Sequence, residues 1–289
     1  MNKLLDSDFE ILDKCPWDDN PAETATFLYQ DDMGCDVVRC PECGIVYAKR
    51  RLNENGLSKY WEDYLTRVHI HDEEAVKKRI KMYQIDYEFS HLYVPTGKVL
   101  DVGCGNGTFM DVYESQGYET FGVEYGKEAA ASAEKRHRVR YGVFDEMDFG
   151  KEQFDLVIFR GVLQNIPNPK AYLEKAVHLL KVDEGHLFIT AQPNMEALAF
   201  HLFGKLFTEP VTGAQFIGLT EAALSTYLDK IGLRKIGERY FYSETPYADE
   251  REDLLKMAKA IQYNNEGKNI DFHAPSYWGN MMTLMYKKI

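Results

Sequence analysis

The chain has 289 residues, of which 45% are hydrophobic and 28% charged, and its formal net charge is -12. This composition is typical of a soluble globular protein, and the excess of acidic residues disfavours a nucleic-acid backbone as the main partner. The sequence contains no apolar run of the roughly 18 residues that a membrane-spanning helix needs, and the acidic N-terminus lacks an apolar stretch of signal-peptide length. We therefore expect a cytoplasmic protein with neither a nucleic-acid nor a membrane partner.

Residues 1–57 are expected to form a cysteine-rich, zinc-ribbon-like segment that contains a small β-ribbon. The sequence "CPECG" places the thiols of Cys40 and Cys43 two residues apart and ends in a glycine that permits a tight turn, a spacing typical of a zinc knuckle. A structural zinc ion would take Cys15 as a third ligand. For the fourth ligand the pattern leaves Cys35 or Asp18 open, and buried thiols without a metal are the alternative interpretation.

Helices and strands are expected to alternate in the rest of the chain. Residues 58–96 form a helical lead-in, because the stretch 58–93 contains no glycine or proline. Residues 97–289 then alternate between apolar strands and amphipathic helices, which predicts an α/β fold: a Rossmann-like, doubly wound, mostly parallel sheet with helices on both faces. The expected strands begin near Lys98 and lie at 118–126, 138–144, 154–159, 185–194, 233–242 and 281–289, and the expected helices lie at 106–117, 127–137, 168–181 and 220–232.

The stretch "VLDVGCGNG" ends the first of these strands in a glycine-rich turn. Such turns commonly bind phosphate at a helix N-terminus, but here the glycine spacing is G-x-G-x-G, whereas the dinucleotide fingerprint is G-x-G-x-x-G, and the lysine of a P-loop is absent. Asp101 stands two residues before the first glycine, where its carboxylate would repel a pyrophosphate but would suit an ammonium or sulfonium group. The turn therefore favours a cofactor without phosphate.

Taken in order, these motifs resemble the class I S-adenosylmethionine-dependent methyltransferases over residues 98–241. "VLDVGCGNG" is similar to the family's first motif, "FGVEYG" to its second, and "FDLVIFRGVLQNIPNPKAYLEKAVHLLK" and "GHLFITAQPN" to the regions of its fourth and fifth strands. The N-terminal "RCPECGIVYAKR" followed by "YWEDYL" resembles a bacterial subgroup that carries a cysteine-rich ribbon. Many members of that subgroup are associated with sugar, polysaccharide or natural-product modification. The resemblance implies S-adenosylmethionine as cofactor and a small-molecule methyl acceptor.

The resemblance also implies roles for residues at the strand ends. An acid at the end of the second strand would bind both ribose hydroxyls, and the glycines would admit the cofactor without a side-chain clash. The implied cofactor-binding residues are Asp101 for the methionyl part, directly or through water, Gly103 and Gly105 in the turn, Glu124 for the ribose, Val143 and Phe144 for the adenine, and Arg160 with Gly161 for the floor of the site.

No catalytic residue can be assigned from the sequence. Many relatives have Glu-His after the fourth strand, where this chain has Gln164-Asn165. Other candidates for a general base are His201, His273, Tyr247 and Tyr277. They lie in two segments, 195–219 and 242–279, that are expected to cover the substrate as lids, with core packing as the alternative.

Two other functions remain open at this point. A nicotinamide-dependent oxidoreductase could use a similar sheet, although the glycine spacing and Asp101 disfavour it. A non-catalytic protein that retains the methyltransferase fold is the second alternative, and the departure at Gln164-Asn165 is the feature that favours it.

Overall fold

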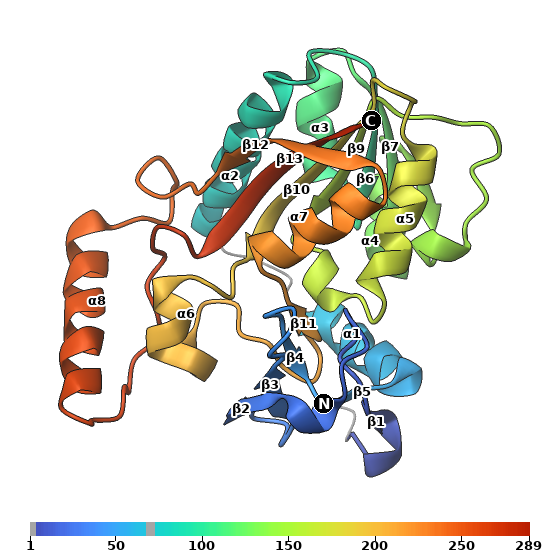
Figure 1. Ribbon diagram of the computed structural model, residues 1–289. Helices are drawn as coiled ribbons and strands as arrows, with labels where there is room; N and C mark the ends of the chain where they lie inside the picture. The colour runs from blue at the N-terminus through green and yellow to red at the C-terminus, as the bar shows by residue number, and fades with distance from the viewer. Residues whose placement is uncertain (1–3, 68–72) are drawn as a thin grey trace.

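One large sheet and two small ones organise the protein (Figure 1). The computed structural model describes residues 4–67 and 73–289. The large sheet has seven strands in the order β12-β13-β10-β9-β6-β7-β8, and β13 runs antiparallel to both of its neighbours while the other pairs are parallel. The mostly parallel, doubly wound sheet expected from the sequence is confirmed. Its strands are β6 (Lys98–Val102), β7 (Glu119–Glu124), β8 (Arg138–Tyr141), β9 (Leu156–Arg160), β10 (His186–Pro193), β12 (Leu233–Arg239) and β13 (Met281–Lys288).

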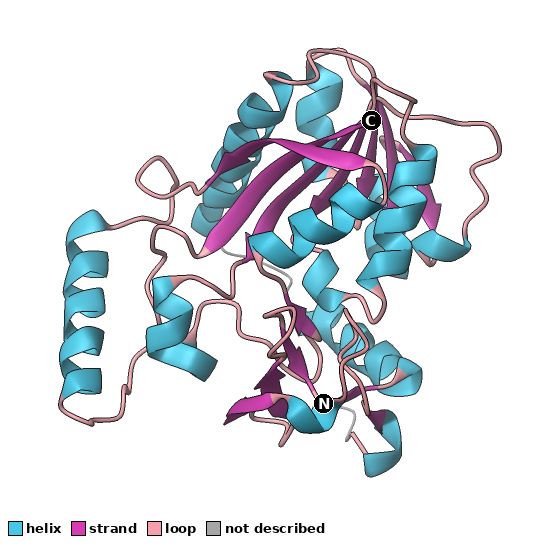
Figure 2. Ribbon diagram, in the orientation of Figure 1, coloured by secondary structure: helices cyan, strands magenta, loops and turns pink. Residues whose placement is uncertain are grey.

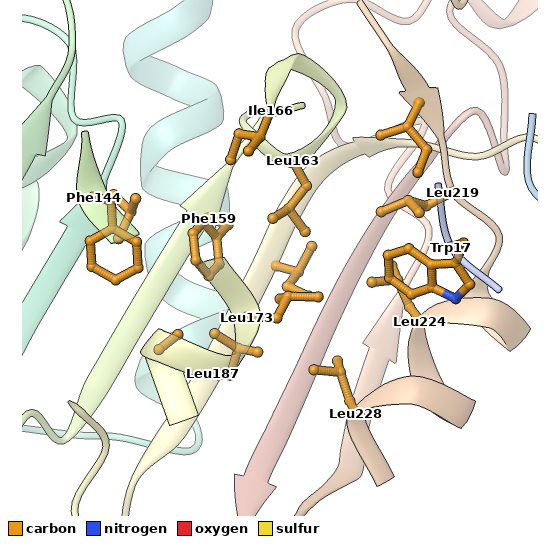
Figure 3. Packing of buried hydrophobic residues seen from close by; sticks show 14 of the residues in the cluster. Trp17, Phe144, Phe159, Leu163, Ile166, Leu173, Leu187, Leu219, Leu224 and Leu228 are labelled. Atoms are coloured by element: carbon orange, nitrogen blue, oxygen red, sulfur yellow. The ribbon is translucent and has the colours of Figure 1, made fainter. Parts of the chain in front are cut away.

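The central strands are apolar because helices cover both faces of the sheet (Figure 2). On one face, α2 and α3 pack through Tyr87 and Phe109 against Phe188 and its neighbours. On the other face, α5 and α7 contribute Leu173 and Leu224 to the largest core cluster (Figure 3). The α-helices of the whole described chain are α1 (Glu54–Arg67), α2 (Glu73–His91), α3 (Thr108–Ser115), α4 (Lys127–Ala133), α5 (Pro169–Leu179), α6 (Leu198–Phe203), α7 (Glu221–Lys230) and α8 (Glu250–Asn265).

Short 3-10 helices connect several of these elements. They are η1 (Asp6–Asp8), η2 (Ala22–Thr24), η3 (Phe144–Glu146), η4 (Leu163–Asn165) and η5 (Gly204–Leu206). Two of them, η3 and η4, follow β8 and β9 directly and so lie at the carboxyl ends of these strands, where ligands bind in open α/β sheets. Within the described residues, we find no helix that is both long and apolar enough to cross a bilayer.

The N-terminal segment folds as two small antiparallel sheets. β1 (Phe9–Ile11) pairs with β5 (Arg50–Leu52), while β2 (Thr26–Gln30), β3 (Asp36–Arg39) and β4 (Val46–Ala48) form a second sheet. A strand from far along the chain, β11 (Ile217–Gly218), completes that second sheet by pairing with β4. The cysteine-rich ribbon is therefore built partly from residues beyond position 57.

The segment 195–219 is packed into this part of the structure. Its four phenylalanines, Phe200, Phe203, Phe207 and Phe216, are all buried. The first three share a core cluster with Val37 and Val46 of the ribbon strands and with residues of α8, whereas Phe216 belongs to the largest cluster. The apolar character of 195–219 thus corresponds to core packing against the ribbon.

Arg39 fixes the ribbon against the end of the large sheet. This residue ends β3, and its guanidinium donates to the carbonyl of Gly44 at 3.0 Å and to that of Met195 at 2.9 Å. Met195 follows the carboxyl end of β10. The ribbon is therefore docked on the edge of the sheet at which parallel strands place their ligand-binding loops.

Candidate functional site

The glycine turn after β6 adopts a backbone conformation that favours glycine. Gly103, Gly105 and Gly107 have φ angles of 78°, 57° and 83°, a region in which side chains are strained. A Cβ atom at Gly103 would lie 2.6 Å from Cγ2 of Val162, so the turn packs tightly against the loop after β9. A Cβ at Gly105 would meet no atom within 4 Å. The backbone at Gly105 therefore borders open space where a ligand can approach closely.

Glu124 lies beside this open space at the end of β7. Its Oε2 accepts a hydrogen bond from the backbone N–H of Gly105 at 2.8 Å, and its Oε1 accepts one from Gly126 at 2.6 Å. Burial raises the pKa of the Glu124 carboxyl, while the hydrogen bonds from Gly126 and Gly105 lower it. A carboxylate has about four acceptor positions, so each oxygen retains capacity for a ligand hydroxyl while the backbone fixes its orientation.

Asp101 is buried within β6, close to the glycine turn. Burial raises the pKa of its carboxyl to about 7; the nearby Arg160 lowers this pKa and Glu124 raises it. The acid expected from the sequence is thus in place, with a carboxyl that a nearby cation would stabilise in its ionised form.

Arg160 ends β9 and is held in place by a residue of α2. Its Nε donates to Oδ2 of Asp86 at 2.9 Å, and its guanidinium lies 4.5 Å from the centre of the Tyr83 ring. The other oxygen of Asp86 accepts from the hydroxyl of Thr190 at 2.6 Å, and Thr190 hydrogen-bonds in turn with Thr283 at 3.0 Å. A buried polar network therefore connects α2 with the end of β9, with the middle of β10 and with β13.

Asp86, Tyr83 and Thr190 were not among the site residues expected from the sequence. The signal in the sequence is the spacing of Tyr83, Asp86, Tyr87 and Ser90 at i, i+3, i+4 and i+7, which places an acid in the buried stripe of a helix. An unpaired buried carboxylate is costly, so Asp86 in that stripe indicates a buried cationic partner. Its identity, Arg160, could be found only in the structure.

Val143 and Phe144 lie at the start of η3, after β8. Phe144 is 1% exposed, and its ring packs against those of Phe149 and Tyr172. It also packs against Phe159 (Figure 3). Because that ring is in the core, a ligand could meet Phe144 only through its backbone, whereas the half-buried Val143 can also offer its side chain.

The candidates for a general base are dispersed. His201 on α6 and His273 are exposed on the surface. The part of the His201 imidazole that is covered by neighbouring residues is enough to lower its pKa, and the nearby Arg39 lowers it further. The ring of Tyr277 packs on that of Tyr242 at 5.3 Å. Tyr247 is 44% exposed. Burial is the main cause of the raised pKa of the Tyr83 phenol, and the nearby Tyr247 raises that pKa further. Tyr247 thus lies in the neighbourhood of Tyr83, whose ring contacts the Arg160 guanidinium.

Three cysteines and one acid of the ribbon converge on a single point. The ligand atoms of Cys15, Asp18, Cys40 and Cys43 all lie within 4.8 Å of one another. The sulfurs of Cys15 and Cys43 are 3.7 Å apart, and two thiolates on one tetrahedral zinc at about 2.3 Å would be separated by about 3.8 Å. Oδ2 of Asp18 is 3.3 Å from Sγ of Cys40. The donor set and spacing fit a zinc ion.

Cys35 lies outside this cluster. Its sulfur is 3.8 Å from Nη1 of Arg50, and burial raises the pKa of its thiol to about 11. Of the two residues that the sequence left open for the fourth position, the structure brings Asp18 to the other three. The opposite orientation of Cys35 agrees with the alternation of side chains along an extended segment.

Comparisons of the sequence and of the structure with known proteins point to one kind of enzyme. A family model described as "Methyltransferase domain" matches residues 59–236. The ubiquinone biosynthesis O-methyltransferase of Stutzerimonas stutzeri is 26% identical over 136 residues, which cover 43% of this chain and 57% of that protein. An uncharacterized protein of Methanocaldococcus jannaschii is 32% identical over 101 residues, covering 35% of this chain and 47% of its own length. The chain thus spans about half the length of the curated relatives it matches.

Solved structures share the fold at low sequence identity. A SAM-dependent methyltransferase from Archaeoglobus fulgidus superposes with a TM-score of 0.54 at 18% identity, covering 78% of this chain and 99% of that one. The 1,6-didemethyltoxoflavin-N1-methyltransferase of Burkholderia thailandensis gives a TM-score of 0.52 at 16% identity, covering 91% of this chain and 99% of that one. The family match spans more than half of the chain, and the sheet order and glycine turn agree with it. The chain belongs to the class I S-adenosylmethionine-dependent methyltransferases.

Proposed function

We propose that this protein transfers the methyl group of S-adenosylmethionine to a small-molecule acceptor of the sugar or natural-product type. The observation that carries the proposal is the arrangement of Asp101 and Glu124 around the open backbone at Gly105. Two acids around a glycine turn suit a ligand that has a cationic part and a ribose diol but no phosphate.

In this proposal each residue has a defined task. Glu124, oriented by the N–H groups of Gly105 and Gly126, accepts hydrogen bonds from both ribose hydroxyls. Asp101 faces the methionyl ammonium, directly or through water. Arg160, whose Nε donates to Asp86, forms part of the floor of the site, where its terminal nitrogens would pair with the methionyl carboxylate. Val143 and the backbone of Phe144 border the adenine.

The chain's contribution to the chemistry is alignment and the exclusion of water. Bound S-adenosylmethionine supplies a methyl group already activated by the sulfonium. Because the transfer is an in-line displacement, holding the two reactants in the correct geometry can supply much of the rate enhancement. The relatives support a small acceptor: one is named as an O-methyltransferase of ubiquinone biosynthesis, and one neighbouring structure is named for a toxoflavin precursor.

We further propose that Cys15, Asp18, Cys40 and Cys43 hold a structural zinc ion. Four protein ligands complete a tetrahedral site and leave no position for substrate, in contrast to catalytic zinc. Such an ion would stabilise a small segment that has little core of its own.

The experiment that tests the cofactor proposal is calorimetric titration with S-adenosylmethionine, S-adenosylhomocysteine and NAD. We expect both sulfur compounds to bind and NAD to give no heat. Binding of NAD instead would support the oxidoreductase alternative, and methyl transfer to no acceptor despite tight S-adenosylhomocysteine binding would support the non-catalytic one.

A pair of glycine variants gives a matched control. Gly105 and Gly117 both have positive φ, and at both positions an added Cβ would lie in open space, but Gly117 lies at the far end of α3. Asparagine tolerates this backbone conformation better than most residues. Gly105→Asn should therefore abolish S-adenosylhomocysteine binding while Gly117→Asn retains it. Equal affinity in the two variants would contradict the proposed site.

A further inference from the structure

One tryptophan lies within the loop 15–20, which carries two of the proposed metal ligands. Trp17 comes two residues after Cys15 and directly before Asp18, and the ligand atoms of both neighbours belong to the cluster. The backbone of the loop closes on itself: the N–H of Cys15 donates to the carbonyl of Asn20 at 2.7 Å, and the N–H of Asp19 donates to the carbonyl of Cys15 at 3.1 Å. An ion held by Cys15 and Asp18 would therefore fix the chain on both sides of Trp17.

The indole of Trp17 belongs to the core of the methyltransferase domain. Trp17 is 7% exposed and shares the largest core cluster with Leu219, Leu224 and Leu228, and Figure 3 shows these four side chains together. Its ring lies 5.1 Å from that of Tyr227, a residue of α7. A residue of the ribbon thus packs on a helix that covers the large sheet.

The backbone of Trp17 binds a second helix on the same face of the sheet. Its carbonyl accepts a hydrogen bond at 2.9 Å from Nζ of Lys170, which lies in the first turn of α5. Nζ of Lys170 also lies 6.0 Å from the centre of the Tyr227 ring, and the Tyr227 hydroxyl donates to Oε1 of Glu174 on α5 at 2.6 Å. Trp17 therefore contacts α5 through its carbonyl and α7 through its ring, where the two helices meet.

A second ribbon residue holds the chain just before α5. Arg51 of β5 is 9% exposed. Its Nε donates to Oε1 of Glu10 at 2.6 Å, and its Nη1 donates to the carbonyl of Pro167 at 3.1 Å. β5 pairs with β1, the strand that precedes the loop 15–20. The ribbon thus contacts the stretch 167–170 at two points, and one of these points is Trp17, between two proposed metal ligands.

The stretch 167–170 continues directly from the proposed cofactor site. β9 ends at Arg160, the short helix η4 follows at Leu163–Asn165, and α5 begins at Pro169. Segments that follow the carboxyl ends of the strands border the ligands of open α/β sheets. A shift at the start of α5 would therefore move the backbone that leads back to Arg160 at the floor of the site.

We propose that Trp17 is a positioning residue, through which metal binding at the cysteine cluster holds α5 and the segment 161–170 in place beside the active site. A large ring buried between helices is held in one closely packed arrangement, and two flanking ligands would keep the loop in the conformation that provides it. Without the metal the loop loses this constraint, since structural metal sites contribute directly to folding. The inference rests on the proposed function, because it assigns a consequence to the proposed metal ion.

Hydrogen exchange with and without EDTA tests where the metal acts. After zinc removal, verified by elemental analysis, the amides of α5 and α7 should exchange at least about tenfold faster. The amides of α3, which packs on the opposite face of the sheet, should keep their rates. In Trp17→Ala, α5 and α7 should exchange faster even with zinc bound, and zinc removal should add little. The conservative Trp17→Phe, which keeps a ring against Tyr227, should restore part of the response to zinc.

Three results of this experiment would overturn the inference. They are unchanged exchange in α5 and α7 after zinc loss, an equal acceleration in α3, which would indicate general unfolding, and a full response to zinc removal in Trp17→Ala. Purified protein without zinc would contradict the proposed metal site, and the inference with it. The exchange measurement needs no cofactor, so failure of S-adenosylhomocysteine to bind would contradict the proposed methyl transfer alone.

Fluorescence follows the indole itself. The chain has three tryptophans, so combining Trp61→Phe with Trp278→Phe leaves Trp17 as the single emitter. Its emission should shift to longer wavelength when EDTA removes the zinc, because a buried indole becomes exposed to water. The control combines Trp17→Phe with Trp61→Phe; it keeps only Trp278, which is already 62% exposed, and should show no shift. Unshifted emission of Trp17 after zinc loss would show that the indole stays docked without the metal, and would overturn the inference.

Discussion

The Nε of Arg160 lies 2.9 Å from Oδ2 of Asp86, and this contact joins the end of β9 to α2. The carboxylate is fully buried and the arginine side chain only 19% exposed. A helix that precedes the sheet in sequence thus supplies the countercharge for a residue at the floor of the proposed cofactor site. The pair fixes the guanidinium near Asp101, whose pKa Arg160 lowers.

Asp86→Asn should destabilise the fold. Removing one member of a buried ion pair leaves the other charge uncompensated, which costs about 3 kcal/mol or more in unfolding free energy. Urea unfolding would measure the loss. The control is Glu244→Gln, which breaks an exposed ion pair with Arg239 and should have little effect. A similar small loss in both variants would show that Arg160 needs no countercharge.

Glu124→Gln should weaken S-adenosylhomocysteine binding by at least about tenfold, since charge-assisted hydrogen bonds to a ribose contribute about 1.5–3 kcal/mol. The amide oxygen can accept from only one of the two backbone N–H groups that hold the carboxylate, so the melting temperature is measured alongside to check that the fold survives. Calorimetric titration measures the affinity, and the exposed Glu128 on α4 provides the control Glu128→Gln. Unchanged affinity in Glu124→Gln would remove this residue from the site.

Cofactor affinity should depend on pH through Asp101. Its pKa of about 7 means that the carboxyl becomes neutral below this pH, and a neutral carboxyl attracts the methionyl ammonium less. Affinity for S-adenosylhomocysteine should therefore rise between about pH 6 and pH 8 and then level off, with proton release on binding. Titration in buffers of different ionisation enthalpy measures both effects. The dependence should disappear in Asp101→Asn.

The raised pKa of Asp101 also predicts that ionisation of this carboxyl lowers the stability of the fold, although it strengthens cofactor binding. The folded state holds the Asp101 proton more tightly than the unfolded state, where the pKa is near 3.8. The contribution of this group to stability is therefore present at low pH and is lost as the pH rises from about 4 to 7. Asp101→Asn should raise the melting temperature of the ligand-free protein at about pH 8. A lower melting temperature would show that the ionised carboxylate is stabilised in the fold.

The cysteine cluster predicts the metal content of the protein. Elemental analysis of protein prepared without chelators should find close to one zinc per chain, and Cys43→Ser should lose the zinc and melt at a lower temperature while S-adenosylhomocysteine still binds. Cys35→Ser is the control, because Cys35 is buried outside the cluster; it should retain the metal. Wild-type protein without zinc would contradict the proposed metal site.

The sequence was sufficient for the large sheet because periodicity and glycine placement are local properties. The central strands β6, β9 and β10 each bury a nearly continuous apolar run, and the turn at Gly103 and Gly105 needs a backbone that glycine adopts most easily. The spacing of Cys40 and Cys43 is equally local, and it identified half of the cluster directly.

Tertiary structure alone decided which distant residues meet. Asp86 contacts Arg160 and Thr190, which lie 74 and 104 positions away in the sequence. Asp18, and not Cys35, joins the three cysteines. β11 completes a ribbon sheet whose other strands all lie in the N-terminal segment. Phe144 packs into the core, which leaves its backbone for a ligand. In each case the decisive quantity is the burial or pairing of a group, and that is set by contacts between segments that no local pattern encodes.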